Sequence, residues 1–326
     1  MQLLRHTQRP VGRLYGPLLH TLFLLLLLSL GAHASSGDRQ RSFVKCLGTC
    51  TLTDCTPTSP ALPLHLRLLG WSCESNCDYH CQRTLTQQAR RDGRRIHQYH
   101  GKWPFVRLWG VQEPASVLFS VLNGWAHLRS LPLVRSIHGM HPMRRWLTVF
   151  VVIGAWAWVC SAVFHTRDFP LTEMLDYFSA GLNVLYILFL GIVRAMRLDS
   201  WRQTRIVALV CGLAYAAHVG YLLRDFDYGY NMAANAVVGL LSNVAWLVVA
   251  MQAYRNRQPF WWKPAVLIVL TDLAFSLELF DFAPWLDTFD AHSLWHAATI
   301  PIIGQWYDYL VRDAKWDMFL DQQRKS

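Results

Sequence analysis

Seven apolar stretches, separated by short polar breaks, fill the larger, C-terminal part of the chain. They cover residues 114–134, 146–164, 175–193, 206–223, 232–254, 264–280 and 291–311. Most approach the roughly 20 residues that a helix needs to cross the hydrocarbon core of a bilayer. Arg129 and Pro132 interrupt the first stretch, and Asp272 and Glu278 fall in the sixth. The pattern predicts an all-α membrane protein in which residues 113–312 form a bundle of seven transmembrane helices.

The composition of the chain agrees with a membrane protein. Hydrophobic residues make up 53% and charged residues only 16% of the 326 residues, which is little charge for a soluble domain. The net charge of +10 could indicate a nucleic-acid partner, but the basic residues are not gathered into one stripe or run. We therefore expect no nucleic-acid partner and explain the basic residues by membrane topology.

Residues 1–34 have the pattern of a secretory signal peptide. Three arginines precede an uncharged, leucine-rich run over residues 22–30, and the small-residue sequence Ala32-His33-Ala34 follows. The apolar run is short for a membrane span. We expect cleavage after Ala34 rather than an uncleaved anchor helix, and either reading directs the chain into the secretory pathway.

Six of the eight cysteines cluster just after this segment. An even number of cysteines in an oxidising lumen predicts three disulfides, whose pairing stays open because six cysteines allow 15 connectivities. A zinc site is the alternative, but the spacings lack paired CxxC motifs. Residues 35–112 are thus predicted to form a small luminal domain, while Cys160 and Cys211 are expected to be reduced packing residues. The clustered cysteines are Cys46, Cys50, Cys55, Cys73, Cys77 and Cys81.

Arginine and lysine residues predict the orientation, because short cytosolic loops hold the excess of positive charge. The connections after the first, third and fifth stretches are basic, as is the tail over residues 313–326, whereas the alternate connections are mainly acidic. We expect a luminal N-terminus and a cytosolic C-terminus. The basic positions are Arg129, Arg135, Arg144, Arg145, Arg194, Arg197, Arg202, Arg205, Arg255, Arg257, Lys263, Arg312, Lys315, Arg324 and Lys325.

Three histidines and one aspartate fall at the luminal ends of predicted helices. Ser161 and His165, like His292 and His296, are four residues apart and therefore share a helix face, and Asp176 opens the third helix. Each histidine alone is more often an interfacial residue, but ionisable groups that converge inside a bundle are costly and tend to be functional.

Three neutral imidazoles with an open position suit catalytic zinc. We expect zinc on the three histidines, with Asp176 moving the proton of the attacking water. Ser161 is expected either to donate to an oxyanion or to orient a ligand. A site at the luminal edge of the bundle lies within reach of lipid headgroups and ester bonds, so we expect the substrate to be an amphiphile such as a lipid.

Other polar residues have simpler expectations. His218 is expected to make a structural hydrogen bond. Asp272 and Glu278 are expected to join a buried polar network or to line the cavity. Lys102 and Trp103, in the sequence HGKWPF, are expected to anchor the chain at the headgroup level.

Several sequence blocks resemble the Per-like family of post-GPI-attachment remodelling proteins. This family is a branch of the CREST superfamily of seven-helix hydrolases, which also includes alkaline ceramidases and adiponectin-type receptors. The superfamily signature matches Ser161, His165, Asp176, His292 and His296. The blocks are HGKWPF (100–105), QEPAS (112–116), FHTRD (164–168), LTEMLDYF (171–178), FDYGYN (226–231) and DAHSLWHAATIP (290–301).

The resemblance implies a GPI phospholipase A2 type of activity, which removes the sn-2 acyl chain from the lipid of GPI-anchored proteins. It implies metal on the histidines, help from the aspartate and serine, and location in the endoplasmic reticulum membrane, with the Golgi as the alternative. Two other functions remain open at this stage. One is ceramide amide hydrolysis at the same metal, and the other is a non-catalytic receptor or cargo chaperone with structural zinc.

Overall fold

The computed structural model describes residues 35–198 and 200–325, and the secondary structure of this part is helical, with only isolated β-bridges besides. The predicted signal peptide, residues 1–34, lies outside the described residues, so its cleavage stays a prediction. The helices are α2 (Arg41–Asp54), α3 (Leu64–Leu68), α4 (Cys73–Arg91), α5 (Pro114–Arg129), α6 (Leu131–Arg135), α7 (Pro142–Thr166), α8 (Pro170–Ala195), α9 (Trp201–Arg224), α10 (Tyr228–Arg255), α11 (Lys263–Ser276), the 3₁₀ turn η2 (Leu277–Leu279) and α12 (Ala291–Lys325).

Each of the seven apolar stretches falls on a helix, but two of them are broken. The first is divided at Ser130 into α5 and the short α6, because Pro132 has no backbone N–H to continue the hydrogen bonding of α5. The sixth passes from α11 into the 3₁₀ turn η2, which carries Glu278. The predicted all-α class is confirmed.

Four helices in the described part of the chain are long and apolar enough to cross a membrane, namely α7, α8, α9 and α10. Helices α5 and α11 have 16 and 14 residues, fewer than the roughly 20 of a full span. Helix α12 has 35 residues, but charged residues are frequent in its C-terminal half. The chain is therefore a multi-pass membrane protein, and the count of seven spans remains a prediction.

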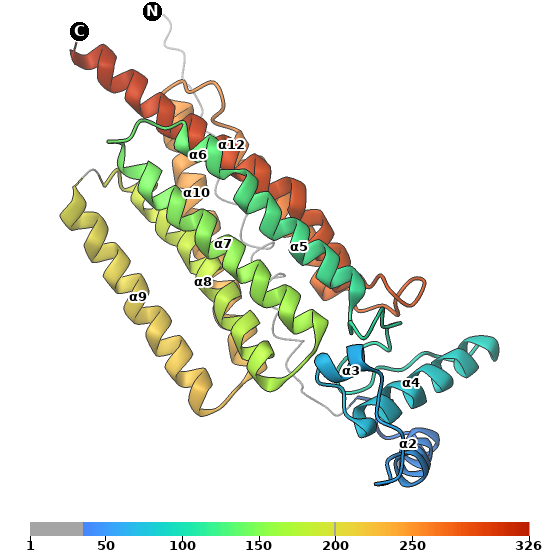
Figure 1. Ribbon diagram of the computed structural model, residues 1–326. Coiled ribbons are helices and arrows are strands. Elements are labelled where there is room, and N and C mark those ends of the chain that lie inside the picture. The colour runs from blue at the N-terminus through green and yellow to red at the C-terminus, as the bar shows by residue number, and fades with distance from the viewer. Residues whose placement is uncertain (1–34, 199, 326) are drawn as a thin grey trace, which may run out of the picture.

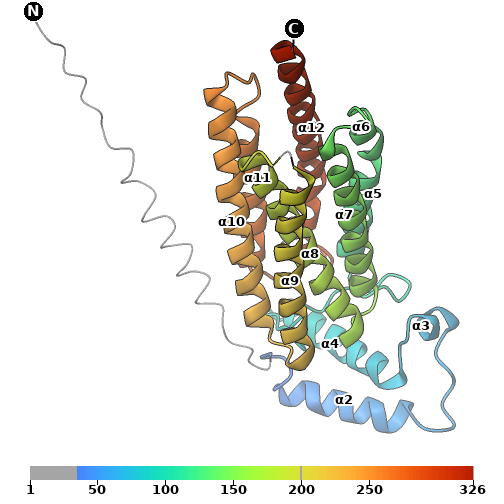
Figure 2. The same ribbon diagram turned by 90° about the vertical axis from the view of Figure 1, so that its left-hand side faces the viewer.

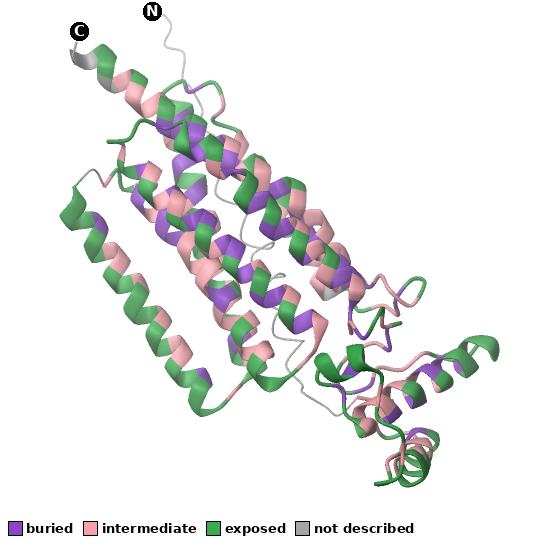
Figure 3. Cartoon of the chain, in the orientation of Figure 1, coloured by how far each residue is buried: buried purple, intermediate pink, exposed green. Residues whose placement is uncertain are grey.

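The long helices run side by side as a bundle, and α2, α3 and α4 lie beyond the end that is opposite the C-terminus (Figures 1 and 2). Helix α5 packs between α7 and α12, and α8 packs against α7 and α10. Helix α9 packs chiefly against α8 and is largely exposed along its length (Figure 3). The basic connections α6–α7, α8–α9 and α10–α11 lie at the C-terminal end of the bundle (Figure 1).

Three disulfides tie α2 to α4 and to the residues between them, which confirms the predicted number. The bonds are Cys46–Cys81, Cys50–Cys77 and Cys55–Cys73. Cys160 and Cys211 are free, as expected. Phe43 of α2 packs against Cys81 and Tyr99 in a small separate core, so the disulfides reinforce a unit with few buried apolar residues of its own.

The main apolar core lies in the half of the bundle nearer the C-terminus. It contains Leu147 of α7, Leu190 of α8, Trp246 of α10 and Tyr307 of α12, all at most 1% exposed. This packing fixes the helices relative to one another at that end. Polar side chains can therefore gather at the opposite end, next to α4.

Gly154 is required for close packing between α7 and α5. The ring of buried His127 donates or accepts a 2.8 Å hydrogen bond with the Tyr307 hydroxyl, and a Cβ added at Gly154 would lie 2.1 Å from that ring. We expect Gly154→Ala to lower the free energy of unfolding by about 1–3 kcal/mol through overpacking. Thermal unfolding of detergent-purified protein, followed by tryptophan fluorescence, measures the effect.

The matched control is Gly239→Ala in α10, where an added Cβ meets nothing within 4 Å. This variant is expected to unfold at or above the temperature of the unmodified protein. Equal unfolding temperatures for the two variants would contradict the assigned packing.

Candidate functional site

Three histidines from two helices meet at the end of the bundle that faces α4. His165 lies in the last turn of α7, and His292 and His296 lie in the first two turns of α12. One ring nitrogen from each falls within 4.8 Å of the others. His165 and His296 are buried, and His292 is partly buried. This group could hold a metal ion.

Cysteine groups do not compete for this role. Two other close groups of potential ligands in the described residues, around Cys50, Cys55 and Cys77, consist of cysteines that are all in disulfides, apart from Asp54. Disulfide sulfur has no thiolate to offer a metal. The histidine group is therefore the candidate site.

Carboxylates hold the Nδ1 atoms of two of the histidines. Nδ1 of His165 lies 2.7 Å from Oε2 of Glu113, and Nδ1 of His292 lies 2.7 Å from Oε2 of Glu278. An ionised carboxylate only accepts hydrogen bonds, so each Nδ1 carries a proton, and in the neutral ring each Nε2 keeps a free lone pair. The two Nε2 atoms face each other at 3.3 Å.

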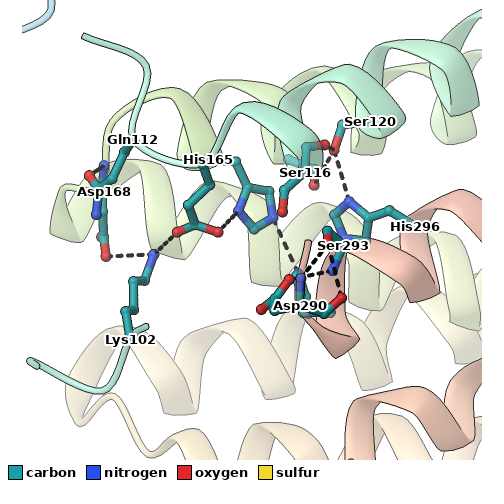
Figure 4. A network of polar contacts seen from close by, with 12 residues as sticks. Lys102, Gln112, Ser116, Ser120, His165, Asp168, Asp290, Ser293 and His296 are labelled. Atoms are coloured by element: carbon teal, nitrogen blue, oxygen red, sulfur yellow. Dashed lines mark hydrogen bonds and ion pairs between the residues drawn. The ribbon is translucent and has the colours of Figure 1, made fainter. Parts of the chain in front are cut away.

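Ser120 orients the third histidine. Its hydroxyl donates to the Ser116 carbonyl at 2.7 Å and lies 3.1 Å from Nδ1 of His296 (Figure 4). Because the hydroxyl proton is already used, Ser120 accepts from Nδ1–H of His296. Nε2 of His296 is then free as well. All three rings thus keep Nε2 for a ligand in the centre.

Ser161 reaches this group only indirectly. It is buried on α7, one turn before His165, and its hydroxyl lies 3.1 Å from that of Ser120. Because Ser120 is an acceptor here, Ser161 donates to it. The contact makes Ser161 part of the support of His296.

Asp176 lies on the neighbouring helix α8, where it is half-buried. Its carboxylate is close enough to His165 and His292 for charge–charge interaction with both rings. Its backbone carbonyl accepts from Ser179, but its side-chain oxygens have no hydrogen-bond partner recorded in the described part of the chain. The carboxylate is therefore available to a ligand at the histidines.

Lys102 is not the headgroup anchor that the sequence predicts. Its Nζ lies 2.7 Å from Oε1 of Glu113 and 2.9 Å from Oδ2 of Asp168, so it faces the site (Figure 4). Burial lowers the pKa of the Lys102 ammonium, but Glu113 and Asp168 outweigh burial and raise it. Burial raises the pKa of Glu113, but Lys102 and His165 hold it well below its usual range. Both groups are charged at neutral pH.

His218 makes the expected structural hydrogen bond, whereas Asp272 is exposed and not part of a buried network. Asp272 of α11 accepts from Asn243 of α10 at 3.1 Å, which joins these helices. His218 lies 3.4 Å from the Tyr230 hydroxyl, away from the three histidines. Glu278 contacts His292 of the histidine group, which agrees with the expectation that it lines the site.

Sequence reasoning missed Glu113, Ser120 and Lys102 as members of this cluster. Ser116 and Ser120 share the four-residue spacing of Ser161 and His165, so a helical face with two hydroxyls was a readable signal. Lys102 and Glu113 fall in the blocks HGKWPF and QEPAS that resemble the family, but no spacing predicts their contacts with the helices, because these depend on how a loop folds.

The arrangement predicts that metal binding depends far more strongly on His165 than on Ser161. We expect His165→Ala to weaken metal binding by more than about 100-fold, the upper range for loss of an outer partner alone. Ser161 contacts Ser120 and no histidine directly, so Ser161→Ala is expected to keep most of its metal. Elemental analysis of purified, dialysed protein measures metal per chain, and equal content in His165→Ala and the unmodified protein would contradict the assigned ligands.

Comparison with known proteins agrees with the sequence resemblance. The Per1-like family model matches residues 63–314. The protein named "Protein PER1 homolog" from Schizosaccharomyces pombe is 40% identical over 307 residues, which cover 91% of this chain and 92% of that protein. A Danio rerio protein named "GPI-specific phospholipase A2-like PGAP3" is 38% identical over 88% of this chain and 93% of its own length.

A third relative comes from Drosophila melanogaster and is named "Post-GPI attachment to proteins factor 3". It is 37% identical over 88% of this chain and 91% of its own length. No solved structure matches the chain. The family model matches most of the chain, and these relatives are 37–40% identical over 88–91% of it, so the chain belongs to the Per1-like family.

Proposed function

We propose that this chain is a zinc-dependent lipid esterase that removes the sn-2 acyl chain from the lipid of GPI-anchored proteins. The observation that carries the proposal is the convergence of one ring nitrogen from each of three histidines, whose Nδ1 atoms all have oxygen partners. The names of relatives support the substrate, since they describe a GPI-specific phospholipase A2-like protein and a post-GPI attachment factor.

The donor set fits zinc. Two nitrogens bound to zinc at about 2.0–2.1 Å with a tetrahedral angle are about 3.3–3.4 Å apart. The Nε2 atoms of His165 and His292 are 3.3 Å apart. Three neutral imidazoles with oxygen partners on their second nitrogens are also the ligand set of catalytic zinc sites.

Bound zinc would supply Lewis acidity, which activates a water and stabilises charge on the ester carbonyl oxygen. Asp176 accepts the proton of the attacking water and passes it to the departing glycerol oxygen. The acyl C–O bond breaks, and the products are a free fatty acid and a lyso-lipid. Ser161 supports His296 through Ser120 and is a positioning residue in this mechanism.

The proposal includes the membrane topology. With seven crossings, the histidines lie at the luminal rim, where the ester bonds of lipid headgroups are within reach. The signal peptide over residues 1–34, a luminal domain over residues 35–112, the hydrolase domain over residues 113–312 and a cytosolic tail over residues 313–326 complete this arrangement. The endoplasmic reticulum membrane is the proposed location, with the Golgi as the alternative.

The test compares the unmodified protein with Asp176→Asn in nanodiscs that contain a GPI-anchored reporter. We expect lyso-GPI and free fatty acid in equal amounts from the unmodified protein. Loss of the proton-transferring carboxylate is expected to slow their release by about 10²–10⁴-fold. Mass spectrometry of the lipid products is the measurement.

His218→Ala is the matched control, because this histidine lies on α9 and contacts Tyr230 instead of the cluster. It is expected to keep full lipid turnover. Equal product from Asp176→Asn and the unmodified protein would defeat the catalytic role. If the protein released fatty acid from ceramide and not from the GPI lipid, ceramide would be its substrate and the proposed GPI substrate would be wrong.

A further inference from the structure

Lys102 and Glu113 lie outside the long helices, yet they are directly connected to the site. Both belong to the segment that links α4 to α5, before the first helix of the bundle. Their charged groups meet the end of α7 at His165 and Asp168 (Figure 4). The segment therefore contributes to the site from the side of the cysteine-rich helices.

Both carboxylate oxygens of Glu113 are in use. Oε2 accepts from Nδ1 of His165 at 2.7 Å, and Oε1 accepts from Nζ of Lys102 at 2.7 Å. The Glu113 backbone N–H also donates to the His165 carbonyl at 3.0 Å. A carboxylate held at both oxygens and at its own backbone cannot rotate, so it fixes the plane of the His165 ring.

Lys102 is itself held in place by three features. Its Nζ contacts Asp168, three residues after His165, and lies 4.2 Å from the centre of the Phe164 ring. Its backbone exchanges two hydrogen bonds with Tyr99, at 2.8 and 2.9 Å, across a tight turn. In this turn His100 and Gly101 both have positive φ, of 50° and 78°.

Docking of the luminal segment alone does not account for this geometry. Arg83 already joins α4 to the α11–α12 connection by a 2.8 Å ion pair with Asp287, and Trp103 donates to Asp281 at 2.7 Å. Neither contact involves a histidine of the cluster. One carboxylate oxygen of Glu113, in contrast, accepts from Nδ1 of His165. This hydrogen bond keeps the proton on Nδ1 and so leaves Nε2 to face the metal.

We propose that Lys102, acting through Glu113, is a positioning residue that fixes His165 for metal binding, so that the segment before α5 is part of the metal centre. This proposal rests on the proposed metal site. It assigns to the HGKWPF sequence a role in metal binding and not in membrane anchoring.

The experiment measures cobalt(II) binding to full-length protein in nanodiscs, because cobalt replaces zinc and its visible spectrum reports ligand geometry. We expect Glu113→Gln to lower cobalt affinity by about 10–100-fold, the usual effect of losing an outer carboxylate. Lys102→Met is expected to lower the affinity in the same direction and to alter the visible spectrum. Lys102→Arg, which can keep both ion pairs, is expected to restore most of the affinity.

Lys263→Met is the matched control. Lys263 forms a 2.5 Å ion pair with Asp308 at the other end of the bundle, and its side chain is 18% exposed against 27% for Lys102. This variant is expected to bind cobalt as the unmodified protein does. Thermal unfolding of every variant shows whether the protein is folded, and if Glu113→Gln does not fold, the comparison of Lys102→Met with Lys102→Arg decides.

Unchanged affinity and spectrum in Glu113→Gln and Lys102→Met would overturn the positioning role. An equal loss in Lys263→Met would also overturn it, because the effect would then be general destabilisation. If the unmodified protein binds cobalt but hydrolyses no GPI lipid, the proposed function fails and the positioning role stands. If the variants lose lipid turnover but keep the metal, the positioning role alone fails.

Discussion

Two imidazole nitrogens that face each other at 3.3 Å set the main constraint on this structure. When both Nδ1 atoms are protonated toward carboxylates and the rings are neutral, the two Nε2 lone pairs repel, and a bound cation would remove that repulsion. The surrounding contacts hold the two histidine rings in this arrangement. Glu113 and Glu278 orient His165 and His292, and in the apolar core at the other end of the bundle side chains of α7 and α12 pack together.

The location of these groups follows from the cost of polar side chains in a membrane. Ionisable groups at helix ends are tolerated where they pair with one another or reach the interface. Glu113 has two such partners, Lys102 and His165, and Glu278 has His292. Glu113 and Glu278 therefore each have a polar partner, which lowers the cost of placing these carboxylates next to the hydrocarbon core.

The sequence predicts the helices and the three histidines better than their surroundings. Apolar stretches and four-residue spacing depend on local geometry alone, so the shared face of His292 and His296 could be read directly. The contact of Lys102 with Glu113 joins two positions of an irregular segment, and neither periodicity nor composition encodes the path of that segment. The break in the first apolar stretch could be predicted only in part, because Pro132 indicates where α5 ends but not the direction in which α6 continues.

The disulfide pairing shows a similar limit. Cys46 and Cys50 are four residues apart, as are Cys77 and Cys81, and the bonds join them in nested order. Two antiparallel helices with cysteines on facing sides produce this order. The pairing could have been derived once α2 and α4 were recognised as helices, but the polar composition of this region gives no amphipathic pattern strong enough to predict them.

The cysteine-rich unit is connected to both helices that carry the histidines. Arg83 of α4 holds Asp287, five residues before His292, while Lys102 reaches His165 through Glu113. The disulfide Cys46–Cys81 ends two residues before Arg83, so the covalent tie to α2 limits the motion of the arginine that holds the start of α12. Contacts outside the membrane helices thus connect the cysteine-rich unit to the three-histidine group, and this unit and the bundle form one connected structure.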